Sequence, residues 1–131
     1  MSFFEKKKTH EVNAHINRLL SDCPESRRLD CRIKHVLVGM VVPLVDRHPR
    51  VDQAFAATTK DFSSRGVGMV FNRPEAPVEA MLGFCIAGNM VFFRAEIKHT
   101  EPIGGGFYLH GFELFEVVSL EDCPELESLT L

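Results

Sequence analysis

The sequence predicts a mainly β fold: a six-stranded antiparallel barrel with an N-terminal helix and a short C-terminal helical or irregular tail. From residue 33 onward, apolar residues alternate with a period of two or form short β-branched runs, which is typical of strands. Glycine, proline and asparagine separate these runs at short intervals, as in a sandwich or a barrel. Closure into a barrel would leave no exposed sheet edge.

The clearest strand is residues 90–98, where Val91, Phe93, Ala95 and Ile97 fall on one face. Gly88 and Asn89 are expected to form the hairpin turn before it, and glycines 104–106 the bend that precedes the last strand. The first expected strand ends at Pro43. The six expected strands are residues 33–42, 51–60, 67–71, 78–86, 90–98 and 107–118.

Residues 9–21 predict an amphipathic helix, because Val12, Ile16, Leu19 and Leu20 fall on one face. This apolar stripe must be buried. We expect it to dock on the protein's own barrel or on a sister subunit, so a homodimer is one expectation. Pro24 ends the helix, and an arginine-rich linker follows it.

The predicted organisation has three parts. Residues 1–26 form the helical extension and linker, residues 27–118 the barrel domain, and residues 119–131 a tail with room for one short helix. A chain of 131 residues suits one compact domain with such an extension.

Composition excludes several classes of protein. The net charge of −3 argues against general binding of DNA or RNA, which needs a basic excess. No run approaches the roughly 20 apolar residues of a membrane helix. The first residues carry their charges after their apolar side chains, the wrong order for a secretory signal. None of the four cysteines forms a Cys-x-x-Cys pair, so we expect reduced thiols and a cytoplasmic protein.

No motif predicts catalysis or a metal site. The six histidines are scattered, without partners at zinc-ligand spacing. Glycines 104–106 are not followed by the Gly-Lys-Ser/Thr of a phosphate loop, and no Gly-x-Ser-x-Gly elbow is present. We therefore expect a binding protein without a cofactor, and not an enzyme.

Two polar segments are candidates for ligand binding. The first carries Arg27, Arg28 and Arg32 just before the first expected strand. The planar guanidinium fork suits phosphates, and its face stacks on purines. Taken alone, this segment is better interpreted as a solvated run of charge.

The second polar segment lies between two expected strands and carries Asp61, Ser63 and Gly66. Asp and Ser oxygens form hydrogen bonds in such turns, and glycine permits a close approach of the backbone to a ligand. Taken alone, this segment also fits an ordinary β-turn.

Together the two segments resemble the PilZ domain family. Arg28 and Arg32 match its Arg-x-x-x-Arg motif, and Asp61, Ser63 and Gly66 match its Asp-x-Ser-x-x-Gly motif at a usual distance. The resemblance continues through the strands that follow, including residues 67–71 and 110–114, and covers roughly residues 27–118.

The resemblance implies a six-stranded split barrel that binds cyclic di-GMP, a bacterial second messenger. By the same resemblance, Arg28 and Arg32 hold phosphate and guanine. Asp61 and Ser63 hydrogen-bond a guanine edge, and Gly66 lets the ligand come close. In the family, an arginine at the position of Arg27 is associated with two intercalated ligand molecules instead of one.

The expected function is a non-catalytic receptor for cyclic di-GMP. Ligand binding would order the arginine segment and signal to a downstream protein partner. The alternative is an adaptor that works by protein contacts without ligand. A small RNA-binding barrel is disfavoured by the negative charge and by a single Tyr and no Trp for stacking. Arg47 and Arg50 lie too close to Asp61 to serve as the motif, and we expect them in a solvated loop.

Overall fold

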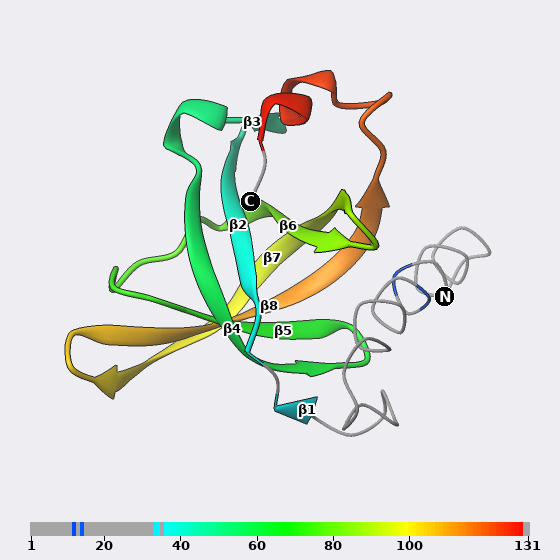
Figure 1. Cartoon of the computed structure of the whole chain (residues 1–131). Coiled ribbons are helices and arrows are strands. Elements are labelled where there is room, and N and C mark those ends of the chain that lie inside the picture. Colours follow the sequence, from blue (N-terminus) through cyan, green and yellow to red (C-terminus); the bar gives the residue numbers. More distant parts are fainter. Residues whose placement is uncertain (1–11, 13, 15–32, 35, 130–131) are drawn as a thin grey trace, which may run out of the picture.

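The computed structural model describes residues 12, 14, 33, 34 and 36–129, which form an antiparallel β structure with two short 3-10 helices (Figure 1). The helices are η1 (Val51–Gln53) and η2 (Pro124–Ser128). The strands are β1 (Ile33–Lys34), β2 (Val38–Val45), β3 (His48–Pro49), β4 (Phe55–Ser63), β5 (Gly66–Phe71), β6 (Glu79–Ile86), β7 (Asn89–Gly104) and β8 (Phe107–Val118).

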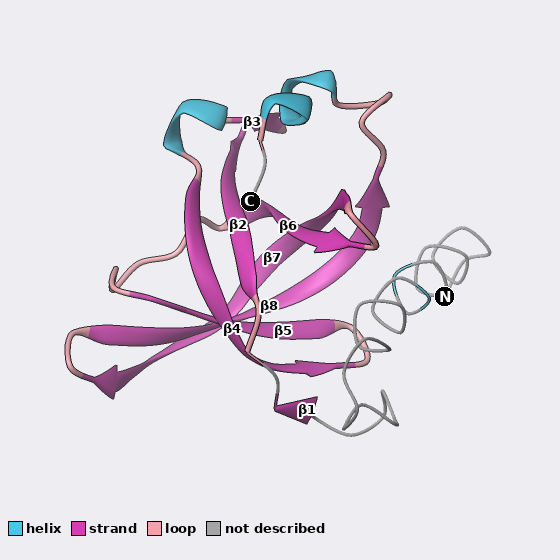
Figure 2. Ribbon diagram, viewed as in Figure 1, coloured by secondary structure: helices cyan, strands magenta, loops and turns pink. Residues whose placement is uncertain are grey.

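Hydrogen bonding closes the main sheet on itself. The strands follow the order β4-β5-β8-β7-β6-β2, and β2 also pairs with β4, so six strands form a ring (Figure 2). The two-residue strands β1 and β3 extend it at β4 and β2. The predicted mainly β, antiparallel fold is confirmed. The predicted N-terminal helix lies outside the described residues apart from Val12 and Ala14, which have helical backbone.

Strand β4 changes its partner halfway along its length. Its first half, from Phe55 to Thr58, pairs with β2, whereas Asp61 and Phe62 pair with β1. Thr59 sits at the change: its N–H donates to the carbonyl of Leu37 at 2.8 Å, and its Oγ1 accepts from the Leu37 N–H at 2.9 Å. These bonds satisfy the backbone where neither partner strand continues.

Some of the predicted strand boundaries were wrong. The first expected strand is split into β1 and β2, and β2 runs through Pro43 instead of ending there. Pro43 pairs with Ala80, and its carbonyl accepts from the Arg50 N–H at 2.8 Å, so the missing proline N–H does not stop the strand. The second expected strand begins instead with η1.

The turns follow the prediction more closely. The β6–β7 turn is Ala87–Gly88, one residue earlier than expected, with φ values of 52° and 81°. The glycine bend is confirmed, because Gly104 pairs with Phe107 across Gly105 and Gly106. The expected short helix in the tail is η2.

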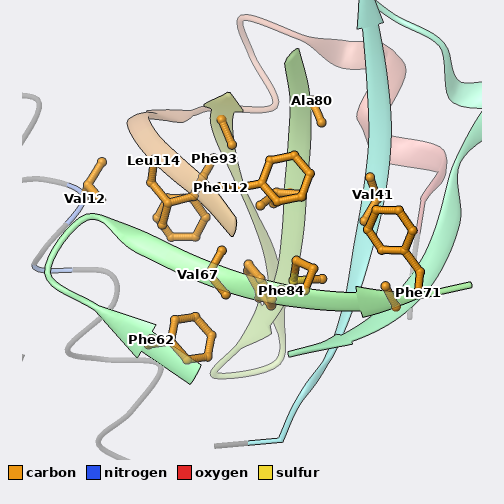
Figure 3. Close-up of a cluster of buried hydrophobic side chains, with 14 of the residues drawn as sticks. Val12, Val41, Phe62, Val67, Phe71, Ala80, Phe84, Phe93, Phe112 and Leu114 are labelled. Carbon is orange, nitrogen blue, oxygen red and sulfur yellow. The ribbon is translucent and has the colours of Figure 1, made fainter. Parts of the chain in front are cut away.

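The interior of the ring holds one hydrophobic cluster (Figure 3). Phe93 and Ala95 are buried in it and Val91 and Ile97 pack against it, as the alternation in β7 predicted. Val12 is also fully buried in this cluster, so the first residue of the expected apolar stripe docks on the protein's own core. The rest of the stripe lies outside the described residues.

A second, smaller cluster lies beneath η2. It joins Leu126 and Cys123 to Phe92, which points away from the main core, and to Val42 and Met81. Burial raises the pKa of the Cys123 thiol to about 11, with a further contribution from its hydrogen bond to Glu125. Cys123 and Cys85 are both free thiols.

His110 is the one histidine among the described residues that is fully buried. Its ring stacks on Phe71 with centroids 3.8 Å apart. Its Nε2–H donates to the carbonyl of Arg73 at 2.8 Å, and its Nδ1 accepts from the Thr100 hydroxyl at 2.9 Å. Burial lowers the pKa of His110, although the hydrogen bond to Arg73 opposes the shift. The neutral ring therefore ties the loop after β5 to β7 and β8.

This environment predicts a pH-dependent part of the stability. The unfolded chain has the ordinary histidine pKa of 6.5, so it binds more protons than the folded state as the pH falls. The contribution of neutral His110 to the free energy of unfolding is complete above pH 6.5 and is lost as the pH falls below it. Urea midpoints at pH 7.5 and 5.5 should differ less in His110→Gln than in the parent. The exposed His48, changed in His48→Gln, is the control, and an unchanged pH dependence in His110→Gln would contradict the assignment.

Candidate functional site

A pocket of about 280 Å³ lies between the β4–β5 hairpin and the neighbouring strands β7 and β8. It contains two of the residues that the sequence predicted as ligand contacts, Ser63 and Gly66. The remaining lining residues are Ser64, Arg65, Val67, Gly68, Lys98, His99, Leu109, Gly111, Phe112 and Glu113.

The hairpin holds the second predicted motif in a defined geometry. Ser63 pairs with Gly66 and Asp61 with Gly68, so Ser64 and Arg65 form the turn. The carbonyl of Arg65 accepts from the Leu114 N–H at 2.7 Å, which fastens the turn to β8. A side chain in place of Gly66 would be crowded, since a Cβ there would lie 3.1 Å from Ser63 Oγ and 3.3 Å from the Phe112 carbonyl.

A bulge at Lys60 sets the direction of Asp61. Thr59 pairs with Met69 and Asp61 with Gly68, so β4 has one residue more than β5 at this point. Ala57 and Phe62 both belong to the core cluster, although an unbroken strand would place them on opposite faces. The extra residue thus turns Phe62 inward and Asp61 outward.

A second bulge acts in the same way on β7. Ile97 pairs with Phe112 and His99 with Gly111, which leaves Lys98 as the extra residue. Ile97 packs against the core, so His99, two positions later, is turned to the outer face.

The two bulges create one outward row across four strands: Asp61, Gly68, Gly111 and His99. Its two central positions have no side chain. A Cβ on Gly68 would lie 2.9 Å from Asp61 Oδ1, and a Cβ on Gly111 would overlap the His99 ring. The carboxylate and the imidazole therefore lean over bare backbone from opposite sides.

Asp61 is buried and takes part in at least one interaction. Its backbone position is opposite Lys34 of β1. Arg27, Arg28 and Arg32 lie outside the described residues, so the structure places the second predicted motif but not the first. The described strand β1 nevertheless begins at the residue that directly follows Arg32.

The charges of the pocket come from three side chains. Glu113 Oε2 lies 3.3 Å from Lys98 Nζ, and Glu113 Oε1 lies 3.9 Å from Arg65 Nη2. The lining thus carries two cations and one carboxylate, an excess of positive charge in a chain whose net charge is −3. The chemistry that this arrangement favours is the binding of an anion.

Sequence reasoning did not select Arg65, Lys98, His99, Gly68, Gly111 or Glu113. Gly68 could have been selected from the sequence, because it is a second glycine two residues after Gly66 in a strand. A glycine inside a strand often marks a place where a ligand or another backbone comes close. Arg65 lies inside the second predicted motif, at one of its variable positions. The others had no signal, because their positions depend on the two bulges and on the pairing of β5 with β8.

A second pocket, of about 520 Å³, lies where β6, β7 and β8 approach η2 and the β2–β3 turn. Arg94, a partly buried cation that lines this pocket, lies 3.1 Å from Glu116 and 3.4 Å from Glu96. Arg47 lines it from an exposed turn, whereas Arg50 pairs with Asp52 at 3.5 Å. No residue of the predicted motifs lines this pocket.

Comparisons with known proteins add no assignment: no protein-family model matches the chain, and no curated protein matches its sequence. Over the described residues, no group of three or more His, Cys, Asp or Glu side chains is placed to hold a metal ion. No helix in that part of the chain is long and apolar enough to cross a membrane.

Two glycine substitutions should have different effects on stability. In Gly111→Ala the atoms nearest to the new Cβ belong to the ring of the exposed His99, which can rotate away, so we expect a change in the free energy of unfolding within about 1 kcal/mol. In Gly83→Ala the Cβ would lie 2.5 Å from the ring of fully buried Phe92, and a loss of about 1–3 kcal/mol is expected. Urea denaturation measures both, and equal effects would show that the His99 ring is not free to move.

Proposed function

We propose that this protein is a non-catalytic receptor for cyclic di-GMP, built on a six-stranded, PilZ-like split barrel. The observation that carries the proposal is the pairing of β1 with the half of β4 that contains Asp61. The arginine motif ends directly before β1, and the Asp-x-Ser-x-x-Gly motif is the β4–β5 hairpin beside it. The two motifs that suggest the ligand are therefore joined through adjacent strands.

The covalent chain limits how far apart the motifs can be. Consecutive Cα atoms are about 3.8 Å apart, and Ile33 pairs with Phe62, between the motif residues Asp61 and Ser63. Ile33, which directly follows Arg32 in the chain, thus lies within one strand spacing, about 4.8 Å, of the second motif. In this proposal Arg32 contacts a ligand seated over Ser63 and Gly66.

The chemistry of the ligand fits the residues assigned to it. Guanine presents the N1–H and amino donors that a carboxylate such as Asp61 accepts, and its O6 and N7 suit an arginine fork. The phosphates suit Arg28 and Arg32. Charge-assisted hydrogen bonds of about 1.5–3 kcal/mol each, less the cost of ordering the arginine segment, are compatible with micromolar affinity, about −8 kcal/mol.

The pocket of about 280 Å³ is at the small end for a nucleotide site. We therefore assign it to one part of the ligand, and the arginine segment to the rest. In this proposal ligand binding orders that segment, and a downstream protein partner reads the changed surface.

Calorimetric titration of the wild-type chain with cyclic di-GMP tests the proposal. We expect a micromolar dissociation constant that rises at least tenfold in Arg32→Ala, because one charge-assisted contact is lost. Arg50→Ala is the matched control, since Arg50 lies before η1 at the opposite end of β4 and pairs with Asp52. Absence of binding by the wild type would refute the proposal and favour a ligand-independent adaptor.

Stoichiometry is a separate prediction. If Arg27 supports an intercalated pair of ligand molecules, the wild type should bind two per chain and Arg27→Leu one. Titration at protein concentrations well above the dissociation constant gives the ratio directly. A ratio of one in both proteins would remove this role from Arg27 without affecting Arg28 and Arg32.

A further inference from the structure

The ion network at the pocket contains more positive than negative charge. Glu113 is the one carboxylate of the lining and faces two cations, Lys98 at 3.3 Å and Arg65 at 3.9 Å. Lys98 is the nearer of the two cations to Glu113. Arg65 is correspondingly less well neutralised.

One of the hydrogen-bond donors of Arg65 is also unpaired within the part of the chain that the structure describes. Its Nε is a buried nitrogen with no hydrogen-bond partner among the described residues. A buried unpaired donor costs about 1–3 kcal/mol, so its retention beside a pocket calls for an explanation. Because Arg65 lines the pocket, a rotation of its side chain would bring this N–H to an acceptor that enters the pocket.

The backbone allows an acceptor to come close. Gly66 pairs with Glu113, and Gly68 pairs with Gly111 two residues further along the same face. Three of these four positions have no side chain. Phosphate oxygens need such an approach, because they are bulky and accept several hydrogen bonds at once.

We propose that Arg65 and Lys98 form a phosphate-binding subsite and that Glu113 is its internal counter-ion. Without ligand, Glu113 holds both cations in place and neutralises one of them. A ligand phosphate displaces the carboxylate and takes up the unpaired Nε–H of Arg65. The identity of the ligand, a cyclic dinucleotide, rests on the proposed function. Lys98 and Glu113 lie outside both sequence motifs, and Arg65 occupies a variable position of the second.

The proposal predicts opposite signs for two neutralising substitutions. Glu113→Gln keeps the size of the side chain but removes the competing charge, so it should tighten binding of cyclic di-GMP about fivefold. Glu113 also pairs across the sheet with Glu96, so the substitution removes a like-charge neighbour and should not unfold the protein. Lys98→Gln should weaken binding about fivefold, and Lys98→Arg should restore it.

The measurement is calorimetric titration at low ionic strength with Arg50→Ala as the control, and thermal melting confirms that each variant is folded. Unchanged or weaker binding by folded Glu113→Gln would overturn the subsite, because general damage cannot tighten binding.

A second probe separates this inference from the proposed function. Titration with inorganic pyrophosphate removes the guanine contacts, and NMR shifts of the Gly66 and Lys98 amides report on binding beside the subsite. If the wild type does not bind cyclic di-GMP but Glu113→Gln still binds pyrophosphate more tightly, the receptor function fails and the phosphate subsite stands. If cyclic di-GMP binds but Glu113→Gln changes the affinity for neither cyclic di-GMP nor pyrophosphate, the subsite fails and the receptor function stands.

Discussion

The two hydrogen bonds between Thr59 and Leu37 hold the ring together where β4 changes partners. Up to Thr58 the strand pairs with β2, which closes the ring, and from Asp61 it pairs with β1, which does not. The backbone between β1 and β2 must leave the edge of β4 and return to it within a few residues. Thr59 supplies both a backbone donor and a side-chain acceptor at that point. The site depends on this junction, because it keeps β1 beside the hairpin.

Two bulges turn Asp61 and His99 to the outer face and so shape the surface that we propose as the binding site. A strand with strict alternation would direct Asp61 and His99 to the same side as the core residues Ala57 and Ile97. One extra residue in β4 and one in β7 reverse this, and the glycines of β5 and β8 leave open backbone between the two side chains. Both extra residues are lysines, Lys60 and Lys98, which tolerate the exposed position of a bulge.

The charges that line the pocket, and not the net charge of the chain, set the electrostatic potential at this surface. The chain as a whole is weakly acidic, yet the lining of the pocket holds two cations against one carboxylate. At physiological salt, charges more than about 8 Å apart are largely screened, so a ligand in the pocket responds to Arg65, Lys98 and Glu113 and not to the net charge. His110, which lies in β8 like Glu113, is buried and neutral, and both of its ring nitrogens are hydrogen-bonded within the protein, to Thr100 and to Arg73.

The sequence by itself determined the class of the fold, most of its strands and the residues of the β4–β5 hairpin. These features are local: alternation of apolar residues, turn glycines and the spacing of Asp61, Ser63 and Gly66 are all read along the chain. Only the tertiary structure decided that β2 continues through Pro43, that Asp61 faces outward, and that Arg65, Lys98 and Glu113 meet. The physical reason is that a bulge shifts every later residue by one face without leaving a compositional mark, and cross-strand neighbours are set by register and ring closure.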